Sequence, residues 1–212
     1  VSENIENIPV VFSMVMDPEG SGLTAKNLTG VSLDIPITTQ FETLKTIIPK
    51  ARKIGVIYNA IENRTIISRA VEIAGEMGFI LKTYPVESIK EIPKVEEMDI
   101  DTLWLIPDTT VCQLEIIKQL LYSALKGKIS VIGISSSYVK AGALFALSCD
   151  YEDIGRQSGE FAIRIFNGEK PTDIPISAPR KTKLYLNLAV ADRLEIEIPE
   201  KIIREAEEVF GK

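Results

Sequence analysis

The chain has 212 residues, of which 45% are hydrophobic and 25% are charged, and its formal net charge is -6. This composition is ordinary for a soluble globular protein with a substantial core. An acidic chain without a Lys/Arg cluster is not expected to bind nucleic acid, because neutralising phosphates requires a basic face. The absence of histidine excludes Ser-His-Asp catalysis, Cys-His catalysis and every histidine-metal site.

Cysteine usage and hydropathy exclude further classes of protein. Cys112 and Cys149 are the only cysteines and are far apart in the chain, so they form neither a CxxC pair nor a thiolate zinc site. We therefore expect two free, buried thiols, no metal and no cofactor. No apolar run approaches the roughly 20 residues that cross a bilayer. The first residues, VSENIENIPVV, lack the basic and apolar regions of a signal peptide.

Short β-branched runs alternate with amphipathic segments, which predicts an α/β fold of parallel sheets flanked by helices. The expected strands are residues 10–14, 54–58, 80–84, 103–106, 131–134, 143–149 and 184–188. Apolar residues at helical spacing predict helices over residues 66–74 and 114–124. A helix over residues 88–98 has a thinner apolar pattern and is interrupted by Pro93.

Capping residues mark the expected helix starts. Thr39 with Glu42, and Thr110 with Gln113, fit the capping box. Pro199 fits the first turn of a closing helix that we expect to reach residue 210. These signals follow strand ends, as a βα unit requires.

A glycine-notched helix is expected directly after the strand at residues 143–149. Asp153 can cap this helix, and Ile154, Phe161, Ala162 and Ile165 recur at helical spacing. Each interior glycine costs a helix roughly 1 kcal/mol. Gly155 and Gly159, four residues apart, therefore predict that another backbone approaches closely. The alternative is an ordinary packed helix.

Polar side chains follow five of the predicted strands, at the edge where open α/β sheets bind ligands. The candidate ligand-binding residues are Asp17, Asn59, Asn63, Asp108, Thr109, Thr110, Ser135, Ser136, Ser137 and Asp150. Hydroxyls, amides and helix N-termini can bind a carboxylate, and Asp carboxylates can accept from an ammonium group. Such a cleft suits an amino acid. Each residue also has a structural alternative, because these residue types are common in turns and caps.

Five blocks in this order resemble the TrpX-like ABC-transporter substrate-binding protein family: IPVVFSMVMDPEGSGL, NLTGVSL, KIGVIYN, LIPDTTV and DYEDIGRQSGEFAIRIFNGEKPTDIPI. The resemblance runs essentially end to end. It implies a type I periplasmic-binding-protein fold, in which two α/β lobes close on a small solute that is passed to an ABC permease. It implies no covalent chemistry, and a periplasmic or extracellular protein with a lipid anchor in its full-length form.

The resemblance also implies a division of the chain. Residues 1–33 would be a remnant of the N-terminal lobe and 34–148 a near-complete C-terminal lobe, with 149–176 returning to the first lobe and 177–212 to the second. The crossovers, expected to act as hinges, would be residues 27–33, 149–150 and 174–178.

Two departures from the family pattern bear on these expectations. The opening βα units of the family are missing, so we expect an excised fragment whose exposed first-lobe remnant pairs with a second copy. Where family members commonly carry a Pro-Gly turn after Tyr58, this chain has the sequence NAIE. The identity of the ligand therefore does not carry over.

Three functions compete. A receptor for a small polar solute, most simply an amino acid and including aromatic ones, uses the whole chain. The same fold serves as the extracellular ligand-sensing domain of a signalling receptor, or as the effector domain of a transcription regulator. A small α/β enzyme is the third, but GxGxxG and Walker patterns are missing and Asp108 has no acid or base partner, so we predict no catalytic residue.

Overall fold

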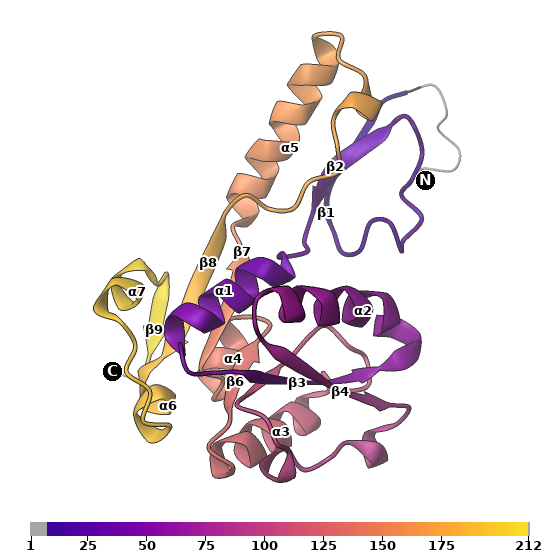
Figure 1. The fold of residues 1–212 in the computed structure, drawn as a ribbon. Coiled ribbons are helices and arrows are strands. Elements are labelled where there is room, and N and C mark those ends of the chain that lie inside the picture. Colours follow the sequence, from indigo (N-terminus) through magenta and orange to yellow (C-terminus); the bar gives the residue numbers. More distant parts are fainter. Residues whose placement is uncertain (1–7, 212) are drawn as a thin grey trace. The chain divides into compact units, whose positions relative to one another are not determined.

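The computed structural model describes residues 8–211, which divide into two compact units (Figure 1). Unit 1 comprises the described residues up to Pro36 together with Cys149–Lys183, and unit 2 comprises Ile37–Ser148 and the described residues from Leu184 onward. The chain passes between the units three times, after residues 36, 148 and 183. The divisions expected after residue 33 and before residue 177 fall inside unit 1.

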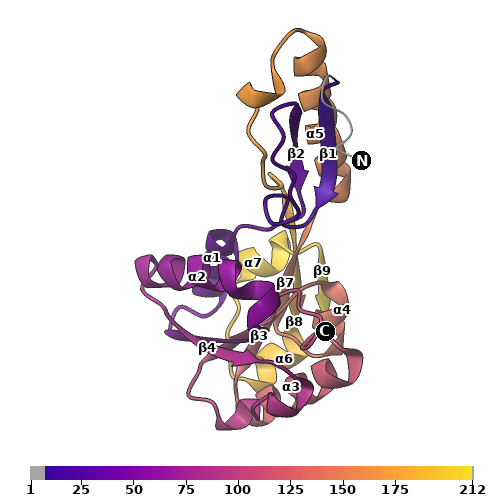
Figure 2. The same cartoon turned by 90° about the vertical axis from the view of Figure 1, so that its right-hand side faces the viewer.

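Unit 1 is a two-stranded parallel sheet covered by one long helix (Figure 2). Its elements are β1 (Val10–Val15), β2 (Leu28–Ser32), α5 (Tyr151–Phe166) and the 3₁₀ turn η4 (Pro171–Asp173). The small core contains Val31, Cys149, Ile154, Phe161 and Ile174. Strand β2 was not predicted, because residues 27–33 were expected to be a crossover between the lobes. All five of its residues are buried.

The N-cap of helix α5 lies three residues earlier than expected. The Asp150 side chain accepts a hydrogen bond from the Asp153 N–H at 3.1 Å and is the actual N-cap. Asp153 therefore lies inside the helix and is buried. The close backbone approach predicted at Gly155 and Gly159 is wrong for the part of the chain that the structure describes, because a Cβ at either position would meet no atom within 4 Å.

Unit 2 is built on a seven-stranded sheet of order β4-β3-β5-β6-β7-β8-β9. Its strands are β3 (Lys53–Asn59), β4 (Ile80–Val86), β5 (Thr102–Trp104), β6 (Ser130–Gly133), β7 (Phe145–Cys149), β8 (Thr182–Asn187) and β9 (Glu208–Phe210). The pairs β3–β4, β3–β5, β5–β6, β6–β7 and β8–β9 are parallel. All seven predicted strands are present, as β1 in unit 1 and as β3–β8 in unit 2. Strands β2 and β9 were not predicted.

Helices cover both faces of this sheet (Figure 1). They are α1 (Ile37–Ile47), α2 (Ala60–Glu76), α3 (Leu114–Lys126), α4 (Ser136–Ala141), α6 (Leu188–Arg193) and α7 (Glu200–Glu205). Side chains alternate between two cores: Trp104 and Ile132 pack with α1 and α2, whereas Leu103 and Val131 pack with α3. Within residues 8–211, no helix has the length and apolarity to span a bilayer.

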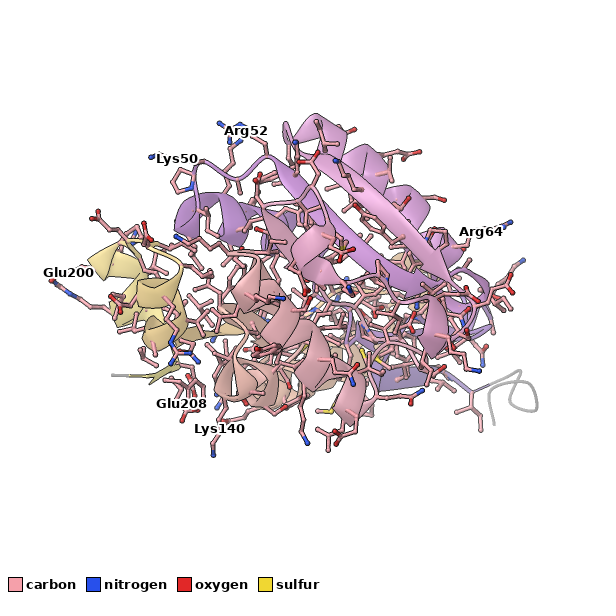
Figure 3. The ribbon with its side chains drawn as sticks, turned by 90° about the horizontal axis from the view of Figure 1, so that it is seen from below. Lys50, Arg52, Arg64, Lys140, Glu200 and Glu208 are labelled. Carbon is pink, nitrogen blue, oxygen red and sulfur yellow. The ribbon has the colours of Figure 1, made fainter. Side chains whose placement is uncertain are left out.

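Trp104 anchors the first of these cores. Its ring meets Phe41 edge-on at a centroid distance of 5.2 Å, and its Nε1–H donates to Gln40 Oε1 at 2.8 Å. Charged side chains of unit 2 such as Lys50, Arg64 and Lys140 are exposed and point away from the sheet (Figure 3). These charged side chains therefore lie outside the two hydrophobic cores of unit 2.

Both capping-box predictions are wrong. Helix α1 begins at Ile37, so Thr39 lies in its first turn and its carbonyl accepts from the Thr43 hydroxyl at 2.8 Å. Helix α3 begins at Leu114, and Gln113 precedes it without a side-chain cap. Thr110 instead belongs to the preceding loop.

Two other helix predictions need correction. Residues 88–98 form two short 3₁₀ turns, η2 (Ile89–Glu91) and η3 (Val95–Glu97), because Pro93 between them prevents a continuous helix. The closing helix begins after Pro199 as predicted but ends at Glu205. The remaining residues turn back to form β9, which pairs with β8.

Candidate functional site

Eight of the ten predicted site residues lie at or after the ends of three adjacent strands of the unit 2 sheet. Asn59 is the last residue of β3, and Asn63 lies in the first turn of the helix α2 that follows. Asp108–Thr110 follow β5, and Ser135–Ser137 follow β6. Because β3, β5 and β6 are neighbours and parallel, their carboxyl ends lie at one edge. Asp17 and Asp150 belong to unit 1.

Asp108 is the hub of this edge. The residue is 5% exposed, and each carboxylate oxygen accepts two hydrogen bonds. Oδ2 accepts from the Asn59 N–H at 2.6 Å and from Asn63 Nδ2 at 2.9 Å. Oδ1 accepts from the N–H groups of Thr110 at 2.9 Å and Val111 at 2.8 Å. A carboxylate occupied in this way organises the two loops rather than offering an open acceptor to an ammonium group.

Asn59 joins the same two loops. Its Oδ1 accepts from the Ile61 N–H at 2.9 Å and caps α2, and its Nδ2 donates to Thr110 Oγ1 at 2.9 Å. The structural alternative for Asn59, a turn or cap residue, thus describes what its side chain does in this structure.

Glu62 is a site residue that the sequence reasoning missed. Its carboxylate accepts from the Thr109 N–H at 3.0 Å and also from the Thr109 hydroxyl. The available signal was its position in the first turn of a helix that starts at a strand end, where an acidic side chain is favoured by the helix dipole. Glu62 and Asp108 together fix the loop after β5 against the start of α2.

The serine run opens helix α4. Ser135 is the residue before the helix, and its hydroxyl lies 2.8 Å from that of Ser137. Behind the run, burial and the neighbouring Cys112 raise the pKa of Tyr138 to about 12. Burial likewise raises the pKa of the Cys112 thiol, whose Sγ donates to the Ile106 carbonyl at 3.1 Å. Both groups are neutral near pH 7, so this part of the edge presents hydroxyls and no charge.

Unit 1 has its own acidic strand exits. The Asp17 N–H donates to both carboxylate oxygens of Asp34, at 3.0 and 3.2 Å, and Asp17 Oδ1 accepts from the Gly20 N–H at 3.1 Å. Asp17 has a positive φ of 40°, so the turn holds it in a conformation that few non-glycine residues adopt. Asp34 was missed because β2 was not predicted; once β2 is a strand, Asp34 is its polar exit.

The two cysteines are free, as predicted; Cys149 is buried and Cys112 is half-buried. Among residues 8–211, no cluster of three or more His, Cys, Asp or Glu side chains is arranged to hold a metal ion. An open depression of about 540 Å³ in unit 1 is lined by Pro9, residues 25–27 and residues 170–172. It adjoins the amino ends of β1 and β2, whereas Asp17 and Asp34 follow their carboxyl ends, so it is separate from the candidate site.

Solved structures show the same architecture. An ABC domain from Streptococcus pneumoniae in complex with L-Trp is 27% identical, with a TM-score of 0.70 over 99% of this chain and 76% of that one. A ligand-free, open substrate-binding protein from Clostridium difficile is 26% identical, with a TM-score of 0.80 over 100% of this chain and 74% of that one. This chain therefore has an α/β fold of the class to which periplasmic binding proteins belong.

The family follows from the sequence comparison. The profile described as ABC transporter substrate binding protein matches residues 1–210, so the chain belongs to that family. A curated relative, the tyrosine-binding protein of Clostridioides difficile, is 28% identical in an alignment 194 residues long that covers 86% of this chain. The chain spans 55% of the length of that relative. The resemblance predicted from the five sequence blocks is confirmed.

Proposed function

We propose that this chain is a solute-binding part of the receptor of an ABC importer and binds a small polar solute, most simply an amino acid and including aromatic ones, without chemistry. One observation carries the proposal: three adjacent strands of unit 2 end in amides and hydroxyls at one edge of the sheet. The names of two similar proteins support the ligand class, since one was solved with L-Trp and the other is a tyrosine-binding protein.

The proposed roles differ among the predicted residues. Asp108 and Asn59 position the loops, because their hydrogen bonds are made within the edge itself. The hydroxyls of Ser135–Ser137 are the groups proposed to bind the carboxylate of the solute. The Thr109 hydroxyl already donates to Glu62, so Thr109 is proposed to position the loop with Asp108 and Asn59. The carboxylates of Asp17 and Asp34 are proposed to accept from the ammonium group. The interlobe cleft that the resemblance implies stays a prediction.

A thermal-shift and calorimetry series tests this proposal. L-Trp, L-Tyr, L-Phe and the branched-chain amino acids are each added to the protein, and a true ligand at a hundredfold excess over its Kd stabilises it by roughly 2.7 kcal/mol. The variant Ser136→Ala/Ser137→Ala should weaken binding of that amino acid about tenfold, the loss of one hydrogen bond or more. Ser68→Ala is the matched control, because Ser68 is an exposed serine within α2.

Two results contradict the proposal. One is an absence of binding for every amino acid tested. The other is chemical turnover, measured by mass spectrometry of the recovered amino acid, because a receptor returns its ligand unchanged. The second result favours the enzyme alternative.

Partners and location complete the proposal. An ABC permease would receive the solute, and the protein would lie in the periplasm or outside the cell with a lipid anchor. Cell fractionation tests the location, and the intact mass of the product tests the lipid anchor.

We also propose a homodimer through unit 1, supported by Ile163 and Phe166, which are 63% and 91% exposed on α5. A single monomeric species in light scattering at high concentration contradicts the dimer.

A further inference from the structure

The segment that leaves η4 is held along β2 before it reaches unit 2. Ile174 is buried, and its carbonyl accepts from the Thr29 hydroxyl at 2.7 Å. The Ser177 N–H donates to the Gly30 carbonyl at 3.0 Å, and the Ser177 carbonyl accepts from the Ser32 N–H at 2.9 Å. Up to Ser177, the segment is therefore fixed to the sheet by backbone hydrogen bonds.

Beyond Ser177, side chains of α5 take over this role. Gln157, which is 6% exposed, donates to the Ala178 carbonyl at 3.2 Å and accepts from the Arg180 N–H at 3.4 Å. The Arg180 guanidinium meets Asp153 with Nε at 2.8 Å and Nη2 at 3.3 Å. It also meets Glu160 with Nη1 at 2.7 Å and Nη2 at 2.9 Å. Three residues of α5 thus hold Arg180, which lies in the segment between η4 and β8; we call this the return segment.

The Asp153 carboxylate is buried and needs Arg180 as its cation. Its side chain is only 5% exposed, and a buried carboxylate is destabilising unless a cation pairs with it. Hydrogen bonds from Arg180 lower the pKa of Asp153 and also that of Glu160. Lys181 lies 3.5 Å from Asp153 but is a point charge, whereas a planar guanidinium can bind two carboxylates at once.

Two hydrogen bonds link residues next to the three crossings between the units. The Asp150 N–H donates to the Lys181 carbonyl at 3.3 Å, which joins the second passage to the third. Cys149 Sγ donates to the Leu33 carbonyl at 3.3 Å, which joins the second passage to the first. Lys181 directly follows Arg180, so a fixed Arg180 also fixes the carbonyl that Asp150 uses.

We propose that Arg180 is a positioning residue that fastens residues 178–181, where the chain returns toward unit 2, to helix α5, so that this segment keeps one position within unit 1 up to the start of β8. Without this clamp, the return segment bends from residue 178 onward. The inference does not depend on which solute is bound, because every contact that carries it lies inside unit 1.

Hydrogen exchange of the whole chain without solute tests the clamp. In Arg180→Met, the amides of residues 178 and 180–182 should exchange at least tenfold faster, and so should the Asp150 amide, which Arg180 does not touch. Arg180→Lys should restore part of the protection. Glu160→Gln keeps Asp153 paired and should give a smaller increase, which provides a measurement if Arg180→Met does not fold.

Arg164→Met is the matched control. Arg164 also makes a two-pronged ion pair from α5, with Nε 2.7 Å from Glu169 Oε2, but contacts none of the passages. Its removal should leave exchange at residues 178, 180–182 and 150 unchanged. Exchange in Arg180→Met within twofold of the parent protein overturns the proposal. A uniform rise through β1, β2 and α5 also overturns it, because that pattern is a loss of stability and not of position.

Discussion

Replacing Asp108 with Asn distinguishes a structural hub from a ligand-binding carboxylate. The substitution keeps the shape of the side chain but exchanges one acceptor oxygen for an NH₂ group. Four donors converge on Asp108, two on each oxygen. In either orientation of the new amide, its NH₂ group faces two of the four donors, and those two hydrogen bonds are lost. The other two donors keep an oxygen acceptor, but it is no longer charged.

The expected cost can be worked out from these contacts. A hydrogen bond to a charged group contributes about 1.5–3 kcal/mol, and a buried donor left unpaired costs about 1–3 kcal/mol. Two lost bonds, partly offset by small shifts of the loops, therefore give a decrease of about 4 kcal/mol in the unfolding free energy of unit 2. That is a large fraction of the 5–15 kcal/mol that is typical of a folded domain.

The fluorescence of Trp104 in urea measures this decrease. Trp104 is the only tryptophan, is 1% exposed and belongs to the unit 2 core, so its emission reports the unfolding of that unit. Asp101→Asn is the matched control: Asp101 is exposed and accepts from the N–H groups of Arg52 at 2.7 Å and Lys53 at 2.8 Å with a single oxygen. Because Asn can present its one oxygen to both donors, the control should lose about 1 kcal/mol or less.

One outcome refutes the reasoning about Asp108. If Asp108→Asn unfolds at the urea concentration of the parent protein yet no longer binds the solute, the carboxylate is a ligand group and not a hub. A loss of stability with solute binding retained supports the hub.

Three further predictions concern buried groups. Leu144→Ala removes a fully buried side chain of the Trp104 core, so the urea titration should show a loss of roughly 2–5 kcal/mol, and a loss below about 1 kcal/mol contradicts that packing. Burial raises the pKa of Cys149 to about 11, so on the order of 0.1% of its thiol is ionised at pH 8; intact mass should show slow alkylation of the native protein, and rapid alkylation contradicts the burial. Tyr138 has a pKa raised to about 12, so its contribution to stability is complete below about pH 10 and is lost as the pH rises to about 12. Ultraviolet titration should show a last phenol step that Tyr138→Phe removes, and persistence of that step contradicts the assignment.

The strands of unit 2 could be predicted because parallel strands covered on both faces are continuous β-branched runs. Strand β2 could not, because its sequence contains a glycine and resembles a loop. A Cβ on Gly30 would lie 2.3 Å from the Phe12 carbonyl, so close packing against β1 requires glycine there. Strand β9 was missed because residues 199–210 also fit a helical pattern, and only its pairing with β8 decides against it.

The site was located by a rule about strand ends, and the rule could not say what the side chains bind. Asp108 meets an N–H donor 49 residues earlier in the chain, and Glu62 meets Thr109 across 47 residues. Local sequence carries no trace of such contacts. The capping-box signals failed for the opposite reason, since Thr39 and Thr110 fit a local pattern that the packing of α1 and α3 does not use.

Unit 1 is discontinuous in sequence, and this has a consequence for how the protein is made. The strands β1 and β2 are synthesised early, but the helix that covers them and the segment that pairs with β2 come more than a hundred residues later; the Thr29 hydroxyl and the Ile174 carbonyl are 145 residues apart. Closing such long loops is slow, so the early strands leave the ribosome with no cover on their apolar face. Most of unit 2 can collapse first. We infer an order of folding in which unit 1 closes only after most of unit 2, when the return segment arrives, and the strands β8 and β9 then complete the sheet of unit 2.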